Sequence, residues 1–299
     1  MTAGPFGNLP RRVRVRDMTL RDGLQSLPQV LPLAVKLELY EALAKANVTD
    51  FQVTSFMNPA RVPQLADAEG LWQALAGRPG RRDVLIANPR GLDRAIAANA
   101  REVETVISAS AAYNLKNTHR SREDSMAEIV AMTKVAHDAG VQFSASVANC
   151  FHCFFEGRID SGLVLDMIGR LTEAGIVEIG LADTTGFATP DAVYELFARA
   201  RAAHPAVTFG AHLHDTQGRG LANAVAALQA GIDWFDAALA GLGGSPFTPG
   251  VGGNLSLEML VDTLGEMGIA TGIDPVLAIK AGKAAARLIG SGGTTPAAA

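Results

Sequence analysis

Cysteine, basic charge and long apolar runs are all scarce in this chain. Its 299 residues include only two cysteines, which excludes a disulfide framework and favours a reducing cytoplasm. The formal net charge of −4 lacks the basic excess that nucleic-acid-binding domains normally carry. No run of 18 apolar residues is present that could span a membrane. We therefore expect a cytoplasmic protein with a sizeable core and with neither nucleic acid nor membrane as a partner.

What the chain does have is a regular alternation of short β-branched runs with longer helical patterns. Helices are expected at 32–46, at 121–140 after a Ser121 cap, and at 189–203, where Thr189 precedes a proline. Strands are expected at 13–19, 51–56, 83–88, 102–108, 141–148, 177–183, 208–214 and 234–239. Eight strand–helix cycles over about 250 residues predict a (β/α)₈ TIM barrel rather than an open doubly wound sheet.

The barrel is predicted to be a single α/β domain over residues 13–290, with an extra C-terminal helix at 275–290. Residues 1–12 contain no acidic residue, as is typical of a transit peptide, but they show no clear amphipathic helix. We therefore expect a short disordered leader. The tail at 291–299 is expected to be disordered as well. The basic stretch PRRVRVR, residues 10–16, alternates in a way that predicts a strand with one exposed face.

Polar side chains stand where predicted strands end, which is where barrels build their sites. His212 and His214 are two residues apart, so on a strand both point to the same face. Asp22 and Asn254 could add oxygen ligands, and this donor set suits Mg²⁺ or Mn²⁺, with Zn²⁺ as an alternative. Arg21 would then point into the barrel mouth. The competing interpretation of this segment is an Asp-Gly turn with a solvated arginine.

Four motifs follow one another along the chain, namely MTLRDGLQ, FQVTSFMNPARVPQLAD, AHLHDTQGRGLAN and GLGGSPFTPGVGGN. In these motifs, their order and their spacing, the chain resembles the 3-hydroxy-3-methylglutaryl-CoA lyase family of metal-dependent barrels. The resemblance extends from about Val13 to Gly290. It implies a (β/α)₈ barrel, a homodimer, a divalent metal, and cleavage of a β-hydroxyacyl-CoA to a ketoacid and acetyl-CoA. By motif match the family's metal ligands and catalytic arginine fall on Asp22, His212, His214, Asn254 and Arg21.

The implied cleavage requires a metal, a cationic side chain and an acid. A metal that holds the substrate hydroxyl lowers its pKa as a Lewis acid. A guanidinium beside it can stabilise the negative charge of the departing thioester enolate. An acid must finally protonate that enolate.

The glycine-rich segment 241–254 departs from the family at the position of this acid. Six glycines and two prolines exclude a helix or an interior strand, so the segment is expected to be a lid that brings Asn254 to the metal. Ser245, nine residues before Asn254, stands where the lyases carry a cysteine. A serine hydroxyl is a much weaker acid than a thiol, and we expect Ser245 to hydrogen-bond the substrate.

At other pocket positions, some residues of this chain differ from those of the family and others are the same. Gln52 stands at a family glutamate, and Ser144 and Ser146 stand at an arginine and a tyrosine. Asn117 and Asp183 match polar pocket residues, so Arg21, Gln52, Asp183 and Ser245 are the candidate catalytic residues. The residues expected to contact CoA or the substrate are Gln25, Asn117, Lys116 and His152, with Arg120 as a second cation for CoA phosphates.

His152 and His119 are the histidines that could replace the missing acid. His152 belongs to the segment CFHC at 150–153, which is not interpreted as a zinc or redox site because it lacks a second cysteine pair.

Several functions remain open from the sequence. A lyase for a different substrate, such as a citramalyl-CoA-like thioester or a free hydroxy acid, is favoured over a slow lyase on the usual substrate. A non-catalytic acyl-CoA-binding barrel is the third possibility, although keeping a whole metal constellation for packing alone would be costly. A metal-dependent aldolase for a free 2-oxo or hydroxy acid is the alternative enzyme class.

Overall fold

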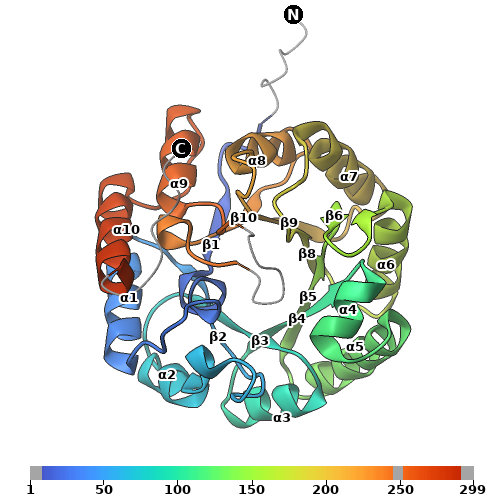
Figure 1. Ribbon diagram of the computed structural model, residues 1–299, viewed down its shortest axis with the longest axis horizontal. Coiled ribbons are helices and arrows are strands. Elements are labelled where there is room, and N and C mark those ends of the chain that lie inside the picture. Colours follow the sequence, from blue (N-terminus) through green and yellow to red (C-terminus); the bar gives the residue numbers. More distant parts are fainter. Residues whose placement is uncertain (1–8, 245–251, 291–299) are drawn as a thin grey trace, which may run out of the picture.

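Parallel strands form a closed barrel in the computed structural model, which describes residues 9–244 and 252–290 (Figure 1). In barrel order the strands are β1 (Arg14–Asp17), β2 (Asp50–Ser55), β3 (Arg81–Ile86), β4 (Glu102–Ser108), β5 (Gln142–Ala148), β8 (Glu178–Asp183), β9 (Thr208–Leu213) and β10 (Trp234–Ala237). The barrel closes where β10 pairs with β1, in a register that puts Asp236 opposite Arg16. A small antiparallel hairpin of β6 (His152–Cys153) and β7 (Gly157–Arg158) follows β5.

Helices surround the barrel and bury the outer faces of its strands (Figure 1). They are α1 (Leu33–Lys45), α2 (Ala68–Ala74), α3 (Pro89–Ala97), α4 (Ala111–Thr118), α5 (Arg122–Asp138), α6 (Ser161–Glu173), α7 (Pro190–Ala203), α8 (Gly220–Gln229), α9 (Leu257–Glu266) and α10 (Pro275–Gly290). Short helices occur at η1 (Thr19–Gly23), η2 (Pro63–Leu65) and η3 (Leu239–Gly241). Of the helices described, none is long and apolar enough to cross a lipid bilayer.

The predicted (β/α)₈ barrel is confirmed, and all eight predicted strands lie within it. The first strand ends two residues early, because Thr19–Gly23 forms a π-helix instead. Ser121 caps α5 as expected, since its hydroxyl accepts a hydrogen bond from the Asp124 amide. Thr189 precedes α7 without making a side-chain cap. The extra C-terminal helix is α10, which lies between α9 and α1 and completes the helical ring (Figure 1).

The chain leading into β1 runs beside the segment that joins α9 to α10. Arg12 forms a parallel bridge with Ala270, whose amide donates to the Arg11 carbonyl. Residues 1–8 and 291–299 lie outside the described part of the chain. The proposed leader and tail therefore stay predictions.

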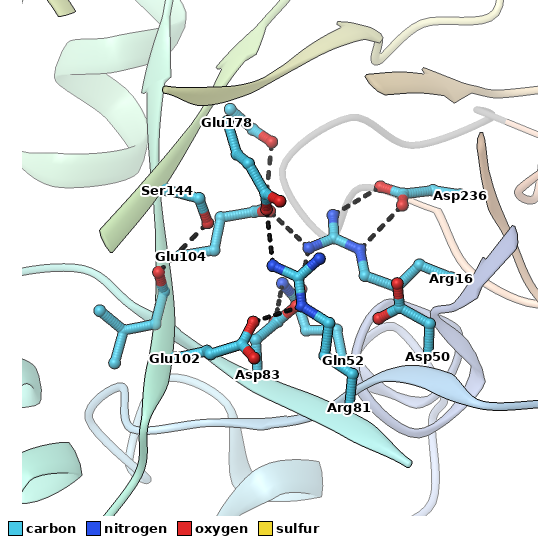
Figure 2. Close-up of polar contacts among 12 residues, drawn as sticks. Arg16, Asp50, Gln52, Arg81, Asp83, Glu102, Glu104, Ser144, Glu178 and Asp236 are labelled. Carbon is cyan, nitrogen blue, oxygen red and sulfur yellow. Dashed lines mark hydrogen bonds and ion pairs between the residues drawn. The ribbon is translucent and has the colours of Figure 1, made fainter. Parts of the chain in front are cut away.

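The barrel interior carries charged side chains where most barrels of this type stack apolar layers (Figure 2). The Arg16 guanidinium on β1 contacts Glu104 on β4 at 2.6 Å, and these strands are not neighbours, so the contact crosses the interior. The expectation of an exposed basic face at 10–16 is therefore wrong for Arg16, which is 2% exposed. Its side chain points inward because carboxylates on three other strands meet it there.

Candidate functional site

Two histidines at the end of β9 and one aspartate after β1 meet at the barrel mouth. Each of Asp22, His212 and His214 offers one ligand atom, and these atoms all lie within 4.8 Å of one another. The π-helix η1 brings Asp22 over the mouth. Parallel pairing of β9 with β10 fixes His212, and His214, just after β9, forms an antiparallel bridge with Asn254. The Nε2 atoms of the two rings are 3.2 Å apart.

The second ring nitrogen of each histidine is bound to an acceptor oxygen. His212 Nδ1 lies 3.1 Å from Asp236 Oδ2, and His214 Nδ1 lies 3.0 Å from the Gly252 carbonyl. Each Nδ1 atom is therefore placed to donate a hydrogen bond, and the Nε2 atom of each ring faces into the site. Burial, together with the neighbouring His212, lowers the pKa of His214 to about 4, so this ring is neutral near pH 7.

Asn254 completes the cluster and has one unused acceptor. Its Nδ2 donates to Asp22 Oδ2 at 2.7 Å and to the Leu242 carbonyl at 2.8 Å. Its Oδ1 is buried and has no hydrogen-bond partner among the described residues. An orphaned buried amide oxygen beside two imidazole lone pairs and a carboxylate is a donor set that fits a divalent cation.

Arg21 and Gln25 hold the Asp22 carboxylate in place. Gln25 Nε2 donates to Asp22 Oδ1 at 2.6 Å, and Arg21 Nη1 donates to the same oxygen. Burial opposes ionisation of Asp22, but the Arg21 charge and the nearby histidines outweigh it and hold its pKa below the usual value. Asp22 is therefore a carboxylate when a cation arrives.

Gly243 lets the chain pass close over this cluster. Its φ is +121°, and a Cβ atom there would lie 2.2 Å from Asn254 Nδ2 and 3.0 Å from Asp22 Oδ2. Only glycine fits this backbone conformation and this close approach.

A pocket opens beside the cluster at the carboxyl ends of the strands. Of the residues singled out from the sequence, its wall includes Arg21, Asp22, Gln25, Asn117, Arg120, Ser146, His212 and His214. Glu104 also lines it, although the sequence pattern did not single it out. Ser245 lies outside the described residues.

Of the residues predicted to be catalytic or to contact CoA or the substrate, four described ones do not line this pocket. Gln52 is buried below it, where it accepts a hydrogen bond from Arg21 Nε. The Asp183 carboxylate accepts the amides of Phe187 and Ala188 at 3.2 and 2.9 Å, and burial raises its pKa to about 6. It therefore shapes the turn after β8.

The remaining two predicted contacts pack against aromatic rings. The Lys116 ammonium lies 4.6 Å from the Phe155 ring centroid, and the His152 ring stacks on Phe187 at 4.9 Å. His119, the other candidate acid, ends α4 in a left-handed conformation and is not among the pocket-lining residues.

An ionic cluster that was not predicted from the sequence lies beneath the metal ligands. Arg16 Nη2 donates to Asp236 Oδ2 at 2.8 Å, and this oxygen also contacts His212. Arg16 and His212 hold the pKa of Asp236 well below its usual value although burial opposes them. The available signal was that Arg16, Asp83, Glu104 and Asp236 each place a charged side chain in a predicted strand.

Comparison with known proteins gives one consistent result. The HMGL-like family model matches residues 12–282. A mitochondrial hydroxymethylglutaryl-CoA lyase of Bos taurus is 35% identical over 94% of this chain and 87% of its own length. A cytoplasmic 3-hydroxy-3-methylglutaryl-CoA lyase of Rattus norvegicus is 34% identical over 94% and 82%. The solved HMG-CoA lyase of Acinetobacter baumannii, in complex with coenzyme A and 3-methylmalate, superposes with a TM-score of 0.89 at 34% identity, over 97% of this chain and 93% of that one.

Proposed function

This chain belongs to the HMGL-like family and is a carbon–carbon lyase, and from that premise we propose that it cleaves a β-hydroxyacyl-CoA, resembling 3-hydroxy-3-methylglutaryl-CoA, into a ketoacid and acetyl-CoA. The observation that carries the proposal is the convergence of two imidazole lone pairs, one carboxylate and one unpartnered amide oxygen beside Arg21 in a pocket. This combination of a cation site with an adjacent fixed guanidinium matches the needs of such a cleavage.

A divalent cation would be held by Asp22, His212, His214 and Asn254. Mg²⁺ or Mn²⁺ suits the mixed nitrogen and oxygen donors, and Zn²⁺ is the alternative. When bound, the cation would lower the pKa of the substrate hydroxyl.

Arg21 would stabilise the charge that develops on the thioester oxygen as the bond breaks. Its guanidinium lines the pocket, and it is fixed by hydrogen bonds to Asp22 and Gln52. A cation held in this way need not reorganise during the reaction. Arg21 is therefore the proposed electrostatic catalyst.

The proposed thioester class rests on the relatives. The Acinetobacter baumannii structure holds coenzyme A and 3-methylmalate, and it covers nearly all of this chain. Asn117 and Arg120 in the pocket wall are polar groups that such a ligand could contact. A cytoplasmic location and a homodimer stay predictions, to be tested by fractionation and by sedimentation.

The test is acetyl-CoA release from 3-hydroxy-3-methylglutaryl-CoA and from citramalyl-CoA, with Mn²⁺ or Mg²⁺ added after chelation. We expect metal-dependent release from at least one thioester, and a loss of about 10²- to 10³-fold or more in Arg21→Met. Ser245→Cys, assayed in parallel, measures whether the family's thiol improves the usual substrate. Absence of acetyl-CoA from both thioesters in both proteins would refute the proposal.

A further inference from the structure

Three buried carboxylates share one guanidinium inside the barrel (Figure 2). Arg16 Nη1 contacts Asp83 Oδ2 at 2.8 Å and Glu104 Oε2 at 2.6 Å, while Nε and Nη2 bind both oxygens of Asp236. With every group ionised, three negative charges would meet one positive charge. An uncompensated buried charge is costly, so the cluster is expected to retain a proton.

Asp83 and Glu104 both contact Arg16 Nη1, so a proton retained by the cluster is expected to lie between these two carboxylates. Burial raises the pKa of Asp83 to about 7, and the nearby Glu104 adds to the rise while Arg16 opposes it. Asp236, in contrast, stays ionised beside Arg16 and His212. Besides Glu104, the strand residues that take part in ion pairs are Arg14 and Arg16 on β1, Asp50 on β2, Arg81 and Asp83 on β3, Glu102 on β4, Glu178 on β8, His212 on β9 and Asp236 on β10. The same strands also carry Asp17, Arg82 and Asp183.

A hydrogen bond connects this proton to the pocket. Ser146 Oγ lies 3.0 Å from Glu104 Oε1, and both residues line the pocket wall. The adjacent Gly180 leaves room for the hydroxyl, because a Cβ atom there would lie 2.4 Å from Ser146 Oγ. Apart from arginines and the candidate metal ligands, Glu104 and Tyr113 are the titratable residues in the described part of the wall.

We propose that Glu104, acting through the Ser146 hydroxyl, supplies the proton to the carbon that carbon–carbon cleavage leaves as an enolate. This inference rests on the proposed lyase function. The electron pair of the broken carbon–carbon bond stays on the thioester fragment as an enolate. The enolate carbon takes the Ser146 hydroxyl proton, and Ser146 takes a proton from Glu104. The Glu104 carboxylate is reprotonated from water after product release. The proton given up by the substrate hydroxyl leaves to solvent, so none is gained or lost overall.

The test compares Glu104→Gln and Ser146→Ala with two matched controls. Glu102→Gln changes the same strand two residues away, where Glu102 binds Arg81 outside the pocket. Tyr113→Phe removes the other titratable group of the wall. Mn²⁺ affinity, measured for each variant, shows whether the metal centre is intact.

Two readouts are required, namely acetyl-CoA release against pH and exchange of acetyl-CoA methyl hydrogens in D₂O. We expect both rates to fall about 10²-fold or more in Glu104→Gln and Ser146→Ala, as for loss of a general acid, with Mn²⁺ affinity unchanged. The pH profile of Glu104→Gln should also lose an ionisation. Glu102→Gln and Tyr113→Phe should stay within threefold of the native protein.

The outcomes separate this inference from the proposed function. Native rates in Glu104→Gln, or a loss confined to Tyr113→Phe, would overturn the role of Glu104 while leaving the lyase function standing. The native protein could exchange acetyl-CoA methyl hydrogens in a way that depends on Glu104 and yet release no acetyl-CoA from either thioester. That result would support Glu104 as the proton donor and reject the proposed substrates. Neither release nor exchange in the native protein would reject both.

Discussion

The Nε2 atoms of His212 and His214 face each other across 3.2 Å. Each ring is held there from behind, by Asp236 and by the Gly252 carbonyl respectively. Two imidazole nitrogens this close require a proton or a cation between them, and a divalent cation can take the place of the proton. Metal binding should therefore stabilise the folded protein as well as serve the reaction.

Removing one imidazole should remove most of the metal affinity. We expect His214→Ala to weaken Mn²⁺ binding by about 100-fold or more, because the ring is one of a few ligands in a buried site. Titration followed by the electron paramagnetic resonance of free Mn²⁺ would measure this. His137→Ala, at a side chain 89% exposed, is the control and should bind like the native protein. Equal affinities in the two variants would refute the assigned centre.

The carboxylate behind His212 should also matter for the metal. Asp236→Asn weakens the acceptor that fixes the His212 ring, and such partners typically contribute 10- to 100-fold in affinity. We expect a loss of about that size in the same titration. Asp233→Asn, an exposed change three residues earlier, should have no effect, and a similar loss there would count against the orienting role.

Gly243 should tolerate no side chain. Gly243→Ala would strain a φ of +121° and press a methyl group against Asn254, so we expect lower Mn²⁺ affinity and a lower free energy of unfolding. Gly265→Ala is the matched control, since it lies in α9 with no atom within 4 Å of the new Cβ. That change should stabilise the protein by about 0.5–1 kcal/mol. Urea unfolding of both variants would decide, and comparable free energies would contradict the close approach.

Stability should fall as pH rises from about 4 to 7, in part because of Asp17. Burial raises the pKa of Asp17 to about 7, although hydrogen bonds from Thr19 oppose the rise. The folded protein then holds a proton that the unfolded chain has released, so the contribution is complete below about pH 4 and lost through pH 7. One such group gives a slope of up to about 1.4 kcal/mol per pH unit.

Asp17→Asn should flatten this slope, because the amide can stay neutral and still accept the Thr19 amide hydrogen bond. Urea unfolding at several pH values between 4 and 8 would show it, with Asp233→Asn as the control that keeps the native slope. A slope unchanged by Asp17→Asn would mean that the carboxyl is ionised in the folded protein.

The barrel and the candidate metal ligands could be predicted from the sequence because both depend on local pattern. Each strand is a short buried run, and His212 and His214 share a face through the strand's period of two. Asp183 shows the limit of the same logic. It ends β8 as predicted, but its carboxylate turns to the amides of Phe187 and Ala188 rather than to the pocket.

The ionic cluster could not be predicted in the same way. Arg16 and Glu104 lie 88 positions apart in the sequence and on strands that do not pair, so no local pattern joins them. An arginine that alternates with valines indicates a strand but not which face is buried. Only closure of the barrel shows that this face is the interior.

Arg16 and Asp236 also stand opposite each other at the junction where the first strand meets the last. They are 220 positions apart, so a growing chain makes the arginine long before its partner. When β10 docks, Asp236 neutralises the Arg16 charge inside the barrel. In the same position it orients the His212 ring. Completion of the fold and readiness to take up metal are thus one event, and a chain truncated before β10 would have neither.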